Sequence, residues 1–120
     1  MRTEPYRVIV WGPGILGQAL IRDIIRKPEF VLVGVLAYSA SKHGVDAGTL
    51  AKVAACGVVA TTDQEAIIGL KADVVFYCPQ TTEPGDPDSE IATTLIRLLE
   101  SGKNVINAIA GFHWPIMYGS

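Results

Sequence analysis

Apolar positions occur in short continuous runs that alternate with longer stretches of helical spacing. Residues 6–11 (YRVIVW) form a β-branched and aromatic run that ends at Gly12-Pro13-Gly14, as in a strand entering a tight turn. The apolar side chains of residues 15–26 then fall on one helical stripe, which Lys27-Pro28 closes. Residues 30–37 (FVLVGVLA) are continuously apolar, as in a strand covered on both faces of a sheet. This order predicts a parallel strand-helix-strand crossover.

The same alternation continues to the end of the chain. Thr62-Asp63-Gln64-Glu65 matches a capping box with the Thr62 hydroxyl at the cap, so a short helix is expected to run to Leu70. The other expected elements are a polar loop at 38–48, a short helix at 47–55, a weak strand at 57–61, a strand at 73–78, a surface loop at 79–88, a helix at 89–101 and a strand at 104–110. This pattern predicts an α/β fold, a Rossmann-type doubly wound parallel sheet with strand order 3-2-1-4-5.

Length and charge narrow the classes of function. The 120 residues correspond to one domain, expected to be a dinucleotide-binding domain over residues 1–120. A net charge of −2, with no end or face rich in one sign, argues against nucleic acid as a partner. No apolar run of about 18 residues and no export signal are evident, so a cytoplasmic protein without a membrane partner is expected. Cys56 and Cys78 lie far apart outside any ligand motif, so we expect neither a disulfide framework nor a metal site.

Three glycines mark the junction of the first strand and helix. Gly12, Gly14 and Gly17 fit the G-x-G-x-x-G pattern in the context that a dinucleotide site requires. Gly12 would permit the sharp turn, Gly14 the approach of a pyrophosphate to the backbone, and Gly17 the close packing of helix on strand. The N–H groups near Ile15 and Leu16, at the positive end of the helix dipole, would stabilise the phosphate charge. The alternative is that the glycines serve only a turn.

The residues after the second strand favour NADP over NAD. An NAD site usually places a carboxylate here to bind the ribose hydroxyls, and this carboxylate would repel a 2′-phosphate. This chain has Tyr38-Ser39-Ala40-Ser41-Lys42 without an acid, so Ser39, Ser41 and Lys42 could bind a phosphate, assisted by His43 if it is protonated. A solvated loop without a role and a protein that accepts NAD as well are the alternatives.

The loops after the last two parallel strands should border the nicotinamide. Cys78 ends an apolar strand without a basic partner, which favours an inert core thiol over a nucleophile. His113 lies beside the expected active-site edge, where a structural role is favoured over proton donation. Trp11, Tyr6 and Tyr77 are interpreted as core or strand-edge aromatics, and no catalytic residue is assigned. The expected cofactor-binding residues are Gly12, Pro13, Gly14, Ile15, Leu16, Gly17, Tyr38, Ser39, Ser41, Lys42, Pro79, Gln80, Thr81 and Ala108.

These residues resemble the N-terminal domain of the dihydrodipicolinate-reductase-like NAD(P)-dependent oxidoreductases. The resemblance is greatest to the branch with 2,4-diaminopentanoate dehydrogenase and the native amine dehydrogenases. It spans nearly the whole chain and rests on four segments: RVIVWGPGILGQAL (7–20), VLVGVLAYSASKHGVDAGTLA (31–51), ADVVFYCP (72–79) and LLESGKNVINAIAGFHWP (98–115). It implies an oxidoreductase that transfers a hydride between a nicotinamide cofactor and a small-molecule substrate, with Gly12, Gly14, Gly17 and the loop at 39–42 contacting the cofactor.

The resemblance also implies what lies outside these 120 residues. Family members have a second domain, C-terminal to this one, that completes the substrate pocket and usually makes the dimer, so a homo-oligomer is expected only for a longer parent protein. The chain alone is expected to bind cofactor without turnover. The amine dehydrogenases carry an acidic pair where this chain has Ala110-Gly111. The carboxylate that would bind an ammonium is thus missing, and an oxo, imine or ene substrate stays open.

The composition indicates that a partner covers part of the surface of the chain. The chain is 49% hydrophobic and 18% charged, below the roughly 25% charged residues of an ordinary soluble domain. The apolar tail at 112–118 follows the last expected strand, and we expect a second domain or subunit to cover it. The alternative function, from a different class, is a stand-alone nucleotide-binding or sensing module without catalysis; a third is an α/β domain that binds no cofactor.

Overall fold

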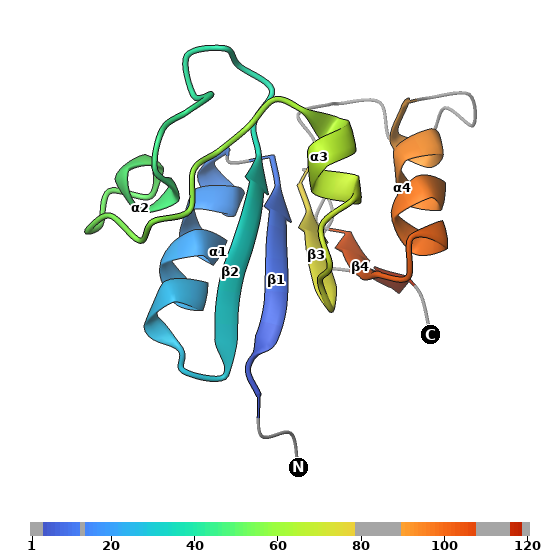
Figure 1. The fold of residues 1–120 in the computed structure, drawn as a ribbon, viewed down its shortest axis with the longest axis horizontal. Coiled ribbons are helices and arrows are strands. Elements are labelled where there is room, and N and C mark those ends of the chain that lie inside the picture. Colours follow the sequence, from blue (N-terminus) through green and yellow to red (C-terminus); the bar gives the residue numbers. More distant parts are fainter. Residues whose placement is uncertain (1–3, 13, 79–89, 108–115, 119–120) are drawn as a thin grey trace.

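One mixed sheet forms the centre of the molecule, with strands in the order β2-β1-β3-β4-β5; Figure 1 shows β2, β1, β3 and β4 of this sheet. The computed structural model describes residues 4–12, 14–78, 90–107 and 116–118. The strands are β1 (Tyr6–Trp11), β2 (Phe30–Leu36), β3 (Val74–Tyr77), β4 (Asn104–Asn107) and β5 (Ile116–Tyr118), and the helices are α1 (Ile15–Arg26), α2 (Ala47–Leu50), α3 (Gln64–Ile68) and α4 (Glu90–Glu100). Strands β1 to β4 are parallel, and β5 is antiparallel to β4.

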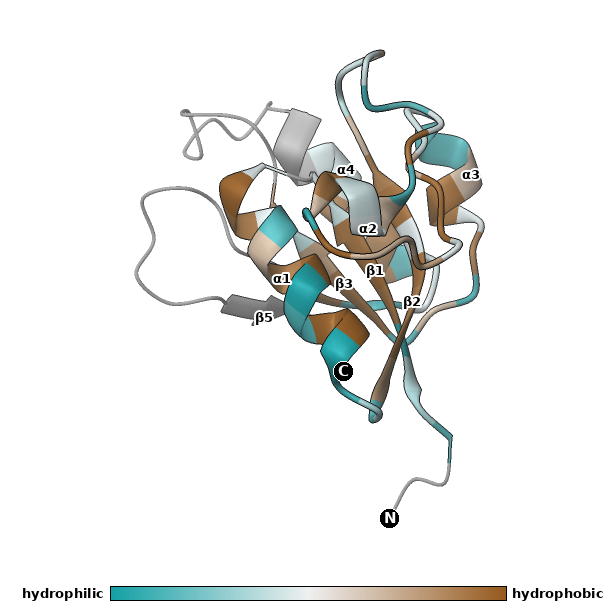
Figure 2. Cartoon of the chain, turned by 90° about the vertical axis from the view of Figure 1, so that its left-hand side faces the viewer, coloured by the Kyte–Doolittle hydropathy of each residue, from teal (hydrophilic) through white to brown (hydrophobic). Residues whose placement is uncertain are grey.

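Helices cover both faces of this sheet because its central strands are apolar on both sides. On one face, Val8 and Val10 of β1 pack with Ile21 and Ile24 of α1 and with Ala47 of α2. On the other face, β1 and β3 contribute to a cluster that includes one side chain each of α3 and α4. In Figure 2 the strands β1, β2 and β3 are brown along most of their length, whereas α1 carries both brown and teal residues. The expected Rossmann-type α/β fold is therefore confirmed.

The expected third strand is reduced to bridges. Residues 57–61 lie on the outer side of β2, where the predicted order 3-2-1-4-5 puts them, but only Thr61 bridges β2 in parallel, at Leu36. The residues before Thr61 form backbone hydrogen bonds with the loop that follows β2. Ala60 N–H donates to the Val45 carbonyl, and Ala47 N–H donates to the Val58 carbonyl. The prediction of a regular strand was wrong because this local hairpin takes the backbone groups that a parallel ladder would need.

Several boundaries also differ from expectation. Helix α2 ends at Leu50 rather than 55, and Lys52 adopts a positive φ of 63° just beyond it. Helix α3 is capped by the Asp63 carboxylate, which accepts from Ala66 N–H at 3.2 Å, and not by Thr62. The tail at 112–118 was expected to be covered by a second domain or subunit; its residues Ile116–Tyr118 form β5, which pairs with the edge of β4. The predicted strand at 104–110 is β4, and its last three residues lie outside the described ranges.

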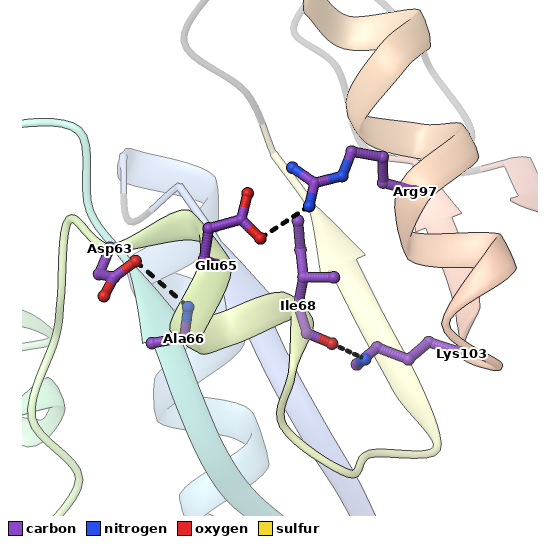
Figure 3. Close-up of polar contacts among 6 residues, drawn as sticks. All are labelled: Asp63, Glu65, Ala66, Ile68, Arg97 and Lys103. Atoms are coloured by element: carbon purple, nitrogen blue, oxygen red, sulfur yellow. Dashed lines mark hydrogen bonds and ion pairs between the residues drawn. The ribbon is translucent and has the colours of Figure 1, made fainter.

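Polar contacts fix α3 against α4 (Figure 3). Arg97 of α4 and Glu65 of α3 form an ion pair at 2.7 Å, and this pair lowers the pKa of Glu65 through the hydrogen bond from Arg97. Lys103, just before β4, is buried and donates from Nζ to the Ile68 carbonyl at the end of α3 and to Ser101 Oγ. Burial lowers the pKa of Lys103. A buried cation thus satisfies the C-terminal end of a short helix.

Candidate functional site

The candidate site lies at the edge of the sheet where β1, β2 and β3 end and α1 begins (Figure 1). Two glycines are crowded there. Gly12 has a φ of +93°, and a Cβ on it would lie 2.0 Å from the Cys78 carbonyl oxygen at the end of β3. A Cβ on Gly17 would lie 2.3 Å from the Gly12 carbonyl oxygen. The backbone at Gly12 thus lies directly against the end of β3, and Gly17 in the first turn of α1 lies directly against the Gly12 carbonyl, so no larger residue fits at either position.

Gly14 differs from both, because it faces open space. Among the described residues outside its chain neighbours, no heavy atom lies within 4 Å of the position of a Cβ on Gly14. Gly14 is the N-cap of α1, in extended backbone at φ −77° and ψ −162°. The first N–H groups of a helix have no partner within it, so those of Ile15 and Leu16 point from the helix start with the positive end of the dipole. A helix start of this kind can bind an anion, and the space beside Gly14 is open among the described residues outside its chain neighbours.

A pair of aromatic residues borders the turn on the side of β2. Trp11, the last residue of β1, is fully buried, and its indole N–H donates to the Tyr38 hydroxyl at 2.7 Å. Tyr38 is 40% exposed, and its Cε2 lies 3.4 Å from the position of a Cβ on Gly12. The ring of Trp11 also packs against Tyr77 of β3, with centroids 5.9 Å apart. Trp11 and Tyr77 were interpreted as core aromatics, which their burial confirms, whereas the link to Tyr38 was not foreseen.

A tight turn directly after Tyr38 contains the residues that were expected to bind a phosphate of the cofactor, which are Ser39, Ser41 and Lys42. Ser39 Oγ and Ser41 Oγ are 2.7 Å apart, Ser41 N–H donates to Ser39 Oγ, and Lys42 N–H donates to the Ser39 carbonyl. Both hydroxyls are exposed, and Lys42 is half-buried. The turn carries no carboxylate. It therefore places two exposed hydroxyls and Lys42 together directly after β2.

His43 forms a hydrogen bond that the sequence did not predict. Its Nδ1 accepts from the backbone N–H of Thr62 at 3.1 Å. The bond ties the turn after β2 to the start of α3. This bond involves Nδ1 only, so the expected assistance of His43 to a phosphate stays a prediction.

Sequence reasoning missed one carboxylate that supports this loop. Asp46 caps α2, and its two oxygens accept from the backbone N–H groups of Gly48, Cys56 and Gly57 at 2.7–2.9 Å. The hydrogen bond from Cys56 is the largest cause of a lowered pKa for Asp46. An aspartate before a helix is an N-cap signal, but the two contacts ten and eleven residues later could not be found from local pattern.

Cys78 is expected to resist modification. It is buried, and this burial raises the pKa of its thiol to about 11, so only about one thiol in a thousand is ionised at pH 8. Iodoacetamide at pH 8 should therefore alkylate the half-buried Cys56 first, and the rate at Cys78 should rise about tenfold for each pH unit up to about pH 10. Peptide mass spectrometry of timed samples measures both rates, with urea-unfolded chain as the control. Equal rates at pH 8 in the folded chain would contradict the inert-thiol interpretation.

Part of the expected site lies outside the described residues. Five of the predicted cofactor contacts lie outside the described residues, as do His113 and the Ala110-Gly111 pair; the five contacts are Pro13, Pro79, Gln80, Thr81 and Ala108. Within the described ranges, no cluster of three or more histidine, cysteine or acidic residues could hold a metal ion. In the same ranges, no helix is long and apolar enough to cross a membrane. The geometry thus brings together the glycine turn, Tyr38 and the turn at 39–42.

Comparisons with known proteins agree with this geometry. Residues 6–82 match the family model described as dihydrodipicolinate reductase, N-terminus. An amine dehydrogenase of Streptomyces virginiae is 33% identical over 102 residues, which cover 82% of this chain and 27% of that protein. The structure of an amine dehydrogenase from Mycobacterium smegmatis superposes with a TM-score of 0.70 at 20% identity, covering 88% of this chain and 30% of that one.

A protein of another class shares the fold. RSP, a Rex-family repressor, superposes in its complex with NADH with a TM-score of 0.62 at 22% identity, covering 89% of this chain and 47% of that chain. At this level of identity the likeness shows the fold alone. The 120 residues span less than a third of each amine dehydrogenase and less than half of the repressor.

Proposed function

Since the chain belongs to the family of dihydrodipicolinate reductase N-terminal domains, we propose that it is the NAD(P)-binding part of an oxidoreductase that transfers a hydride to or from a small molecule. The family and the related proteins indicate an NAD-binding domain of the dehydrogenase type. One observation supports the proposal above the others: the open Gly14 between the crowded Gly12 and Gly17. A turn without a ligand has no need of a glycine at this position, because its φ suits any residue.

The chain's own residues bind and orient the cofactor in this proposal. The backbone at Gly14, Ile15 and Leu16 holds the pyrophosphate at the start of α1, and Tyr38 and the turn at 39–42 border the adenosine half. When bound, the nicotinamide supplies or accepts the hydride. The expected contacts at 79–81 and at Ala108 follow β3 and β4 in the chain and stay predictions. The groups that handle the substrate are proposed to come from outside these 120 residues, so the chain alone is expected to give no turnover.

The substrate is proposed to be a carbonyl, imine or ene compound rather than an amine. The named relatives are amine dehydrogenases, yet residues 110–111 of this chain are Ala-Gly and offer no carboxylate to an ammonium group. A module that senses the nucleotide without catalysis is the alternative. Substrate-dependent oxidation of the reduced cofactor by a parent protein, with none by the 120-residue chain, would favour the enzyme.

We expect NADPH to bind at least about tenfold more tightly than NADH, because charge-assisted hydrogen bonds to a 2′-phosphate are stronger than neutral ones. Fluorescence titration of both reduced cofactors with the 120-residue chain measures the two dissociation constants. Lys42→Ala serves as the matched variant: it should weaken NADPH binding and leave NADH binding unchanged. Tighter binding of NADH would overturn the NADP preference alone, and no binding of either at millimolar concentration would overturn the dinucleotide site.

A further inference from the structure

A buried tryptophan is hydrogen-bonded to an exposed tyrosine at the edge of the candidate site. Trp11 has no exposed surface, so it cannot touch a ligand, and its indole N–H donates to the Tyr38 hydroxyl at 2.7 Å. Its ring is held in turn by the packing against Tyr77. The donor is therefore a rigid group of the core, and the acceptor is the tip of a side chain that is 40% exposed.

The position of Tyr38 makes this bond relevant to binding. Its ring lies against Gly12 on one side, and the turn that begins at Ser39 follows directly in the chain. Because Tyr38 follows β2 at the carboxyl end of the parallel strands, it lies where a dinucleotide crosses this edge of the sheet. Aromatic rings are good stacking partners for bases. An adenine ring at this edge would meet the exposed part of Tyr38.

We propose that Trp11 is a positioning residue, which acts through Tyr38 to hold the ring that receives the adenine of the cofactor. This inference rests on the proposed dinucleotide function and names how one half of the site is organised. A half-exposed tyrosine ring that lacks an anchor samples several rotamers, and a base that stacks on it must pay for fixing one of them. The hydrogen bond from Trp11 fixes the Tyr38 ring before the ligand binds, although Trp11 itself does not contact the ligand.

The test uses ADP, the half of the ligand that NAD and NADP share, titrated calorimetrically into the 120-residue chain. Tyr38→Ala removes the ring and should weaken ADP binding about tenfold. Tyr38→Phe keeps the ring without the acceptor, and Trp11→Phe removes the donor; each should weaken binding about threefold. The double variant should bind no more weakly than either single variant, because both substitutions remove one and the same bond.

A matched control separates positioning from stability. Ile67 belongs to the same core cluster as Trp11 but to α3, so Ile67→Val should lower the melting temperature and leave ADP binding unchanged. ADP binding by Trp11→Phe that equals that of the parent chain, or independent additive effects of the two Phe substitutions, would overturn this inference while leaving the dinucleotide site intact. A parent chain that binds neither ADP nor either reduced cofactor would overturn the proposed function, and this inference with it.

Discussion

Replacing Gly14 by aspartate is expected to abolish dinucleotide binding and at the same time to make the chain slightly more stable. A carboxylate at this N-cap would accept the first N–H groups of α1, in backbone that already has the extended geometry of a cap, and would complement the helix dipole. The free energy of unfolding should rise by about 0.5–1 kcal/mol. The same carboxylate fills the open space and repels a pyrophosphate, so cofactor affinity should fall at least about hundredfold.

Gly14→Asn is the matched control, because asparagine has the same shape and caps a helix equally well without the charge. It should retain part of the stability gain and lose less affinity than the aspartate variant, and the difference between the two should shrink as salt is added. Cofactor titration and urea unfolding of the same samples measure both quantities. Normal binding by Gly14→Asp would show that no phosphate approaches this helix start, while a large loss of stability would show that the position is not open.

A substitution that raises the free energy of unfolding but lowers cofactor affinity would distinguish a functional glycine from a structural one. The three glycines look alike in the sequence, where each is one letter of a common motif. The structure separates them by what surrounds each: backbone oxygens lie within 2.0–2.3 Å of a Cβ on Gly12 and Gly17, and no described atom outside the chain neighbours lies within 4 Å of one on Gly14. Crowding is a property of packing between distant segments, so local pattern could suggest the three roles without measuring them.

The parts of the fold that were predictable are those that local physics decides. Short runs rich in apolar residues indicated β1, β2, β3 and β4, because strands buried on both faces tolerate few polar residues. The helical stripe of residues 15–26 and Gly102 after α4 set the bounds of the two long helices. The strand order then followed from the rules for parallel crossovers.

The failures share one physical cause, which is competition from contacts distant in the chain. The Thr62 hydroxyl was expected to cap α3, but it lies 3.4 Å from His43 Nδ1, and Asp63 caps the helix instead. Residues 58–60 had strand character, but their backbone groups are hydrogen-bonded to the loop after β2 instead of to β2 itself. The bond between Trp11 and Tyr38 joins the ends of two strands and has no trace in either segment alone. The cofactor contacts at 79–81 and 108 stay predictions, since they lie outside the described residues.

Gly12→Ala is expected to produce the largest loss of stability, about 2–5 kcal/mol in the free energy of unfolding. Two effects add. The φ of +93° is a conformation that an L-residue adopts at a cost of about 1–2 kcal/mol. A methyl group 2.0 Å from the Cys78 carbonyl oxygen must in addition push β3 away from the turn, and such overpacking costs about 1–3 kcal/mol. Because small domains are stable by about 5–15 kcal/mol, urea unfolding followed by circular dichroism should show a clear shift of the midpoint.

Gly102→Ala separates the two effects, since Gly102 has nearly the same φ of +92° and no described atom outside its chain neighbours lies within 4 Å of its Cβ position. It should lose only the backbone term of about 1–2 kcal/mol. The excess loss in Gly12→Ala then measures how tightly the end of β3 is held against the glycine turn. Equal losses in the two variants would mean that β3 yields freely, and a site that depends on the meeting of β1, β3 and α1 would then lack the rigidity that orienting a cofactor requires.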